Sequence, residues 1–262
     1  MMTARELMRT CEKIAREYNT CYVWGGCGMP VTERTLADKL AQYPEQNRTY
    51  CAQARKYLDK DFWMFDCVCL IKSVLWQWSG NRNAYYGGAV YASNGVPDVS
   101  ADGMIGRCKS VSTDFSKITP GEALWLPGHI GVYLGSGLAA ECTPAFAGGV
   151  QITNVWNVGG SAYPGRKWQK HGLLPWVDYK AEKQEVWQDG QQKNPMAKIV
   201  VNGTEYPIER ILQDGRNYFQ IRPLVDILNQ EGLRIAVGNV GSTAVLTFDA
   251  PQYDEDGKIV KT

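Results

Sequence analysis

A cysteine and a histidine that lie far apart in the sequence are the residues with the clearest chemical potential. Cys67 follows Asp66 at the start of an apolar run, and His129 is one of only two histidines in the chain. A thiol that an imidazole can deprotonate is the minimum for nucleophilic attack on a carbonyl carbon. The pair therefore predicts cysteine-based acyl transfer. The commoner alternative for Cys67 is a buried cysteine that acts only as a small apolar side chain.

The segment after Asp66 predicts a helix over residues 67–78. Its residues are apolar except for three polar ones, Lys72, Ser73 and Gln77. Such a composition is typical of a helix that is buried on most sides. The Asp66 carboxylate can accept hydrogen bonds from the unpaired backbone N–H groups of the first turn. Cys67 would then lie at the positive end of the helix dipole, a position that favours the thiolate.

His129 begins a segment in which apolar residues alternate with polar or small ones, a pattern that predicts a strand. The segment after the following Gly-Ser-Gly sequence predicts an antiparallel partner strand. In that register Leu134 faces Leu138 and Gly131 faces Glu141. The Glu141 side chain can then reach His129 because Gly131 leaves space between them. Glu141 is therefore the candidate that orients the imidazole and stabilises its protonated form. Without the other two groups, a solvent-facing glutamate would be the simpler interpretation.

Three sequence blocks occur around these residues. They are Tyr-Val-Trp-Gly-Gly at residues 22–26, Phe-Asp-Cys at 65–67, and Gly-His-Ile-Gly-Val-Tyr-Leu-Gly at 128–135. In this order they resemble the motifs of the NlpC/P60 cysteine peptidases, which cut bacterial peptidoglycan. The resemblance covers residues 10–180, and further segments within it resemble endolysins of phages and prophages of Gram-positive bacteria.

The resemblance implies an α+β, papain-like domain, in which the helix that bears the cysteine packs on an antiparallel sheet that bears the histidine. It implies Cys67 as the nucleophile, His129 as the general base and then the general acid, and Glu141 as the third polar residue. No metal or organic cofactor is required for this chemistry. The implied substrate-binding residues are Tyr22, Trp24 and Asp66.

The chain departs from the family pattern in three places. Val68 and Cys69 replace the Ser-Gly that usually follows the nucleophile, and Glu141 stands where the family more often has histidine. Cys69 is two residues beyond Cys67, about 200° around a helix, so it is not expected to share the same site. Residues 27–62 form an insertion between the first two motifs, with helices expected over 32–58. This insertion is expected either to wall one side of the cleft or to serve as scaffold.

The resemblance implies an endolysin-like peptidoglycan hydrolase that acts on stem peptides and cleaves an amide bond next to D-glutamate. One alternative is an N-acetylmuramoyl-L-alanine amidase, which cuts between muramic acid and L-alanine. An alternative from another class is a wall-binding protein whose cysteine domain has lost catalysis, which the altered Val68 and Cys69 positions suggest.

Composition is compatible with this interpretation. The chain has 262 residues, 44% of them apolar, and a formal net charge of +1. These values predict one or two domains with an ample core, and they argue against a general nucleic-acid surface. The eight cysteines could supply metal ligands, as Cys21 with Cys27 or as Cys67, Cys69 and Cys142 with His129. No paired Cys-x-x-Cys spacing supports zinc, so mostly free and buried thiols are expected.

The N-terminus lacks the continuous apolar region of a secretory signal, and residues up to 18 predict an amphipathic helix. No segment is apolar over a length that could cross a bilayer, so no membrane insertion is expected. These features predict a protein that is made in the cytoplasm without a signal peptide. It would act on the cell wall after release, through a holin pore if a phage encodes it.

The composition changes after residue 180 to a polar stretch rich in lysine, glutamate and glutamine. Residues 1–180 are expected to be the catalytic domain, 181–196 a polar linker, and 197–262 a small module. Asn-Gly at 202–203 and Asp-Gly at 214–215 predict two hairpins, followed by a helix over 222–231 and strands over 233–237 and 243–248. The module resembles repeats of clostridial surface proteins related to the copper amine oxidase N-terminal domain. It has no histidine or cysteine, so copper is not implied. Wall attachment or self-association is expected, with a passive stabilising role as the alternative.

Overall fold

A computed structural model describes residues 1–159 and 163–180, and several segments nearer the C-terminus. Those segments are residues 196–201, 204–213, 216–219, 221–230, 232, 235–240, 243–248, 252–253 and 259–261. The chain divides into two compact units, Met1–Val186 and Trp187–Thr262. The predicted linker over 181–196 lies outside the described residues except for its last residue.

The first unit is built around a seven-stranded sheet with the strand order β10-β9-β8-β7-β6-β11-β5. All neighbouring strands in it are antiparallel except β10 and β9, which are parallel. Together with the helices, this sheet confirms the predicted α+β class. The strands are β5 (Lys109–Ser112), β6 (Ala123–Leu126), β7 (His129–Gly135), β8 (Leu138–Thr143), β9 (Gly149–Val155), β10 (Gly165–Arg166) and β11 (Lys170–Leu173).

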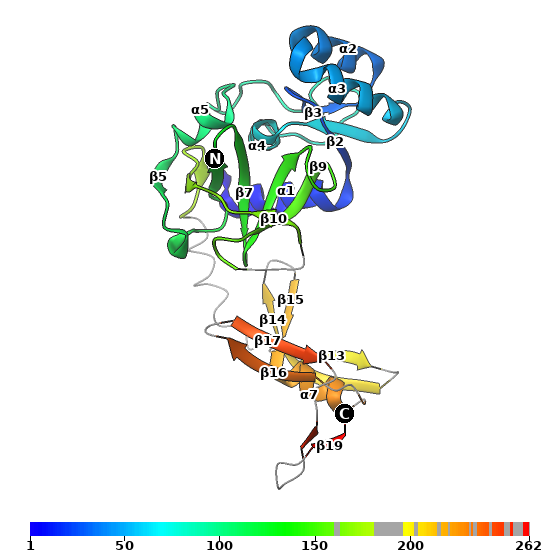
Figure 1. Cartoon of the computed structure of the whole chain (residues 1–262), viewed down its shortest axis with the longest axis vertical. Coiled ribbons are helices and arrows are strands. Elements are labelled where there is room, and N and C mark those ends of the chain that lie inside the picture. The colour runs from blue at the N-terminus through cyan, green and yellow to red at the C-terminus, as the bar shows by residue number, and fades with distance from the viewer. Residues whose placement is uncertain are drawn as a thin grey trace. The chain divides into compact units, whose positions relative to one another are not determined.

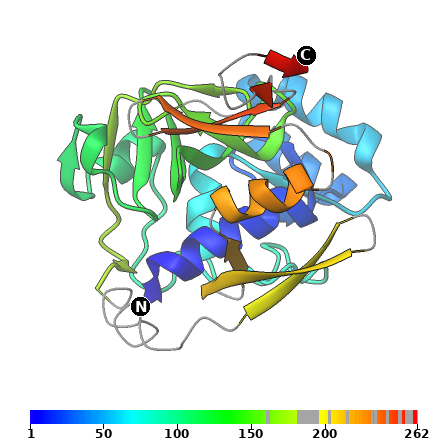
Figure 2. The same cartoon turned by 90° about the horizontal axis from the view of Figure 1, so that it is seen from below.

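Helices α1 (Ala4–Glu17) and α4 (Cys67–Leu75) pack on this sheet. Helix α1 contacts β7, β8 and β9, and α4 contacts β7 and β8 as well as α1. Figure 1 shows α1, in blue, crossing behind β7 and β9, and Figure 2 shows the same helix from below. Its capping box joins Thr3 and Glu6, and its buried face carries Leu7, Cys11 and Ile14. The amphipathic N-terminal helix predicted from the sequence is therefore confirmed.

Helix α4 ends three residues earlier than predicted. Gln77 adopts a φ of 66°, a left-handed conformation that cannot continue a helix. The indole N–H groups of the two flanking tryptophans bind backbone oxygens elsewhere, Trp76 to Val96 at 2.9 Å and Trp78 to Gly28 at 2.8 Å. These tertiary hydrogen bonds fix the chain outside the helical path.

A three-stranded sheet lies next to α4 in the first unit, with the order β2-β4-β3. Its strands are β2 (Asn19–Tyr22), β3 (Cys27–Pro30) and β4 (Phe62–Phe65). Between β3 and β4 the chain forms α2 (Glu33–Gln42), α3 (Pro44–Ala54) and the 3₁₀ turn η1 (Arg55–Tyr57). The helical insertion predicted over residues 32–58 is thus confirmed, and the Thr32 side chain caps its first helix.

Shorter elements complete the first unit. They are α5 (Ala101–Ile105), η2 (Phe115–Lys117), β1 (Met2–Thr3) and β12 (Val177–Asp178), and the last two pair in parallel. This pairing joins the first residues of the unit to residues near its C-terminal end. Within the described parts of the chain, no helix combines the length and the apolar character needed to cross a membrane.

The second unit has the element order predicted for the small module. Strands β13 (Met196–Val201) and β14 (Thr204–Gln213) pair, as do β14 and β15 (Arg216–Phe219). Helix α7 (Ile221–Gln230) follows, and then the hairpin of β16 (Ile235–Val240) and β17 (Thr243–Phe248). The predicted Asn-Gly and Asp-Gly turns lie outside the described residues. A further pair, β18 (Gln252–Tyr253) and β19 (Ile259–Lys261), was not predicted.

Candidate active site

Asp66 joins two of the sequence motifs at the start of α4. One carboxylate oxygen accepts from the backbone N–H of Cys69 at 2.7 Å, and the other accepts from that of Gly25 at 2.8 Å. The predicted N-cap is therefore confirmed. Because both oxygens already bind backbone groups, the contacts of Asp66 are those of a residue that positions the helix and the glycine loop. A substrate contact by Asp66 stays a prediction.

Cys67 is the first residue of α4 and is buried. Its sulfur lies 3.9 Å from the backbone oxygen of Gly128, the residue before the histidine. Burial raises the pKa of this thiol to about 12, and the Asp66 carboxylate acts in the same direction, while the backbone N–H groups of Cys67, Val68 and Ile130 oppose it. The predicted thiolate is therefore wrong for the free site, because desolvation outweighs the helix N-terminus.

This raised pKa predicts slow and strongly pH-dependent alkylation of Cys67. Between pH 7 and pH 9 the folded thiol should react more slowly than the same thiol in unfolded protein, because less of it is deprotonated. The rate should rise about tenfold per pH unit across this range, since the thiolate fraction does so below the pKa. Iodoacetamide labelling of Cys67, followed by peptide mass mapping of native and urea-unfolded protein, measures both rates. A native rate that is constant from pH 6 to pH 9 would contradict the neutral thiol.

His129 and Glu141 form a close pair between β7 and β8. The imidazole Nε2 lies 2.5 Å from a Glu141 carboxylate oxygen, and the Glu141 side chain is fully buried. Gly131 faces Glu141 as predicted. The expected pairing of Leu134 with Leu138 is wrong, because a bulge after Tyr133 shifts the register and places Gly135 opposite Leu138.

Three residues that the sequence analysis did not select complete the surroundings of this pair. The Arg166 guanidinium contacts both Glu141 oxygens, with Nη2 at 2.9 Å and Nε at 3.2 Å. The Thr153 hydroxyl donates to Glu141 at 2.6 Å. The Trp168 ring stacks on the His129 ring, with centroids 5.4 Å apart and an interplanar angle of 13°. The stacked Trp168 ring therefore restrains the plane of the imidazole, and Glu141 holds its Nε2 edge.

Gly131 makes this arrangement possible. A Cβ atom added there would lie 3.2 Å from Trp168 and 3.2 Å from the Cβ of Glu141, and 3.0 Å from a backbone oxygen. The predicted need for space at residue 131 is thus confirmed. Arg166 and Trp168 gave no sequence signal, because they lie in and beside the two-residue strand β10, which is too short for periodicity to be visible.

The contact of the thiol is with the backbone of the residue before the histidine, and the described chain shows no hydrogen bond between the thiol and the imidazole. The sulfur lies near the Gly128 oxygen, whereas the His129 ring binds Glu141 through Nε2. Nδ1 is then the ring nitrogen that does not contact Glu141. The structure thus places Cys67 against the residue next to His129.

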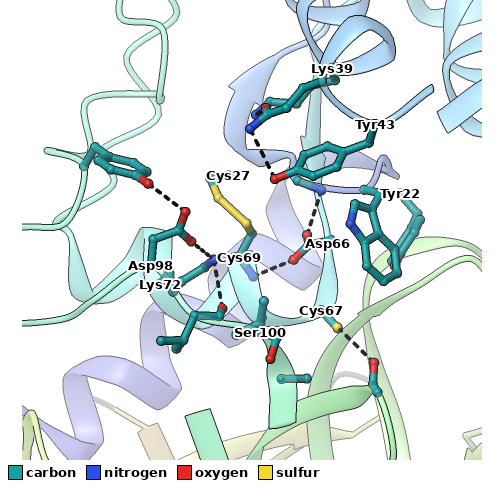
Figure 3. Close-up of a pocket in the computed structure, with 18 of the residues that line it drawn as sticks. Tyr22, Cys27, Lys39, Tyr43, Asp66, Cys67, Cys69, Lys72, Asp98 and Ser100 are labelled. Carbon is teal, nitrogen blue, oxygen red and sulfur yellow. Dashed lines mark hydrogen bonds and ion pairs between the residues drawn. A yellow bond between two sulfur atoms is a disulfide. The ribbon is translucent and has the colours of Figure 1, made fainter. Parts of the chain in front are cut away.

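A cavity of about 530 Å³ opens beside Cys67 (Figure 3). Tyr22, Trp24 and Asp66, the three predicted substrate-binding residues, all line it. Helix α2 and the residue after it also line it, through Lys39, Gln42 and Tyr43, so the insertion forms one wall. Burial raises the pKa of Tyr22, which keeps its phenol protonated as a hydrogen-bond donor.

Cys69 is bonded to Cys27 in a disulfide, and both residues line the same cavity as Cys67. The prediction that Cys69 stays apart from the Cys67 site is therefore wrong. Cys67 and Cys69 both belong to the first turn of α4, and the cavity extends around the N-terminal end of that helix. The other six cysteines are free, five of them buried, as expected. Among the described residues no three histidine, cysteine, aspartate or glutamate side chains gather as they would around a metal ion.

Comparison of the sequence with known protein families finds no match, and comparison with curated proteins finds none either. The site combines a thiol at a helix start, an imidazole that is backed by a carboxylate and follows the residue contacted by the thiol, and an open cavity. Together these groups can carry out nucleophilic attack with general-base assistance.

Proposed function

We propose that the first unit is a papain-like peptidoglycan hydrolase of the NlpC/P60 type. It cleaves an amide bond of the stem peptide, next to D-glutamate, with Cys67 as nucleophile. The observation that carries this proposal is the pair of His129 with the buried Glu141, which follows directly on Gly128, the residue whose backbone oxygen lies 3.9 Å from a thiol in the wall of a cavity. An imidazole backed by a carboxylate is the partner that a thiol nucleophile needs.

The reaction begins from a protonated thiol. The His129 Nδ1 takes the Cys67 proton as the sulfur attacks the amide carbonyl carbon, and backbone N–H groups at the start of α4 stabilise the oxyanion. The tetrahedral intermediate collapses as the imidazolium protonates the leaving amine, which leaves a thioester. Water, deprotonated by His129, then hydrolyses the thioester and restores the thiol.

Glu141 acts through His129 in this scheme. It fixes the ring so that Nδ1 is the reactive nitrogen, and it stabilises the positive charge that the ring gains. Arg166 and Thr153 hold the carboxylate in place, and the stacked Trp168 restricts rotation of the ring. All four residues are thus positioning residues for one imidazole.

The amide bond that is cut can be identified by mass analysis. Purified peptidoglycan is digested with the full chain, and the soluble muropeptides are sequenced. The endopeptidase releases peptides with an amino terminus newly formed after glutamate, whereas the amidase separates muramic acid from L-alanine. Digestion that frees only L-alanine termini would replace the endopeptidase by the amidase, and binding to the wall without any new amino group would favour the non-catalytic wall-binding protein.

Activity on the cell wall also implies a place of action. The proposed protein is made in the cytoplasm and acts on stem peptides of the cell wall after its release, which depends on a holin if a phage encodes it. The second unit is proposed to attach to the wall or to self-associate, and it takes no part in the chemistry proposed for the first unit.

A further inference from the structure

Lys39 is a buried cation in the wall of the cavity. The residue is only 6% exposed, and its ammonium donates to the side-chain oxygen of Gln42 at 2.8 Å. It also lies 5.9 Å from the centre of the Tyr43 ring. Both contacting groups, the Gln42 amide and the Tyr43 ring, are uncharged. Burial lowers the pKa of Lys39. A buried charge without a facing counter-charge is costly, so its retention at this place calls for an explanation.

The other charged side chains that line the cavity have close partners. Lys72 forms an ion pair with Asp98. Asp66 accepts from two backbone N–H groups, and Asp102 accepts from an indole N–H at 2.8 Å and a backbone N–H at 2.9 Å. Asp66 and Asp98 influence Lys39 only by attraction over a longer distance. Of the two lysines among the described residues that line the cavity, Lys39 is therefore the one without an ion pair.

A chain of hydrogen bonds orients the groups around Lys39. Since an ammonium can only donate, Gln42 must turn its carbonyl oxygen to Lys39 and its NH₂ group to the Tyr43 hydroxyl, 3.2 Å away. The Tyr43 oxygen thus accepts from Gln42, and its own proton is available to another acceptor. Lys39 keeps two further N–H groups. Figure 3 shows Lys39 and Tyr43 at one end of the cavity and Cys67 at the other.

We propose that Lys39 and Tyr43 form a carboxylate-binding subsite, which selects peptides with a free carboxylate near the amide that reaches Cys67. A carboxylate offers two acceptor oxygens to the two donors, and its charge offsets that of the buried ammonium. This inference rests on the proposed function and names the substrate class more closely. It also gives the insertion a role, because α2 and the residue after it supply the subsite.

Two stem peptides that differ in one group test the subsite. One carries the free α-carboxylate of its glutamate, and the other carries a carboxamide there. The intact chain should cleave the carboxylate peptide with a kcat/KM about 10- to 100-fold higher, as expected for a charge-assisted hydrogen bond in a buried site. Lys39→Met should remove this preference by raising KM for the carboxylate peptide alone, and Lys39→Arg should restore part of it.

Thermal unfolding separates this role from a merely structural one. Lys39→Met removes a buried charge and keeps the length of the side chain, so the variant should melt at the same temperature as the parent protein or higher. A lower melting temperature together with an unchanged peptide preference would show that Lys39 only supports the fold. Equal cleavage of the two peptides by the parent protein would also overturn the subsite.

A binding measurement separates failure of the subsite from failure of the proposed reaction. Calorimetric titration of the Cys67→Ala chain with both peptides reports recognition without cleavage. If this variant prefers the carboxylate peptide and the double variant with Lys39→Met does not, the subsite stands even when the parent protein hydrolyses neither peptide. The subsite is overturned if the Cys67→Ala chain binds both peptides equally, or binds neither of them, whether or not the parent protein hydrolyses the wall.

Discussion

Replacement of Cys67 by alanine is expected to lower the rate of peptidoglycan hydrolysis about 10⁴-fold or more, because the reaction has no other nucleophile at the start of α4. The variant should keep its fold, since it loses only one sulfur atom beside an existing cavity. The measurement is the release of new amino groups from purified wall. Circular dichroism and thermal unfolding check the folded state of the variant.

Cys108→Ala is the matched control for this experiment. Cys108 is also a free cysteine, but its sulfur contacts the backbone oxygen of Met104, and it does not line the cavity of Cys67. This variant should retain nearly all activity. Comparable hydrolysis by Cys67→Ala and the parent protein would refute the thiol mechanism, whereas comparable loss in both variants would point to a general effect on folding.

Replacement of Glu141 by glutamine is expected to lower kcat by up to about 10⁴-fold, the loss known for an amide in place of the carboxylate behind a catalytic histidine. Glutamine can donate as well as accept, so it no longer fixes one state of the His129 ring. It also cannot balance the charge that the ring gains during the reaction.

The same substitution should cost about 3–5 kcal/mol of stability, because it leaves the Arg166 guanidinium without the carboxylate that it contacts twice. Activity must therefore be measured well below the melting temperature of the variant. Arg166→Met together with Glu141→Gln removes the unpaired charge. Partial recovery of stability without recovery of kcat is the expected outcome for a carboxylate that acts through His129.

The second histidine provides the matched control. Glu122 binds His171 Nδ1 and the backbone N–H of Thr119, and the Nε2 of His171 contacts the Asp114 oxygen at 3.1 Å. Both side chains are buried, and this pair lies on β11 and next to β6, whereas Gly128, the residue that Cys67 contacts, directly precedes β7. Glu122→Gln should lower stability and leave kcat unchanged. If Glu122→Gln and Glu141→Gln reduce kcat equally, the pair of His129 and Glu141 has no special role.

Several features of the site followed from the sequence because short-range rules determine them. Asp66 before an apolar run predicted the cap and the start of α4, and alternation around His129 predicted β7. The spacing across the Gly-Ser-Gly turn placed Gly131 opposite Glu141, although the bulge beside the turn changed the pairing of Leu138. Hydrogen bonding between neighbouring strands fixes this register, so the contact between His129 and Glu141 could be expected.

Other features depended on residues that meet only in the folded chain. The pKa of Cys67 is set by how much water the surrounding elements exclude, and a helix start alone gave the wrong sign. Arg166 and Trp168 reach the histidine from a segment without a regular pattern. Lys39 lies in a helix of mixed composition, and only the fold places its side chain in the cavity wall.

The sequence by itself determined which residues could react and which elements carry them, because capping, alternation and turn chemistry act over a few residues. Only the tertiary structure decided the charge state of the thiol, the residues that hold Glu141, and the placement of Lys39 in the cavity. These properties depend on burial and on contacts between residues as distant as Cys27 and Cys69 or Glu141 and Arg166. Desolvation and ion pairing are set by all neighbours in space, so no local pattern encodes them.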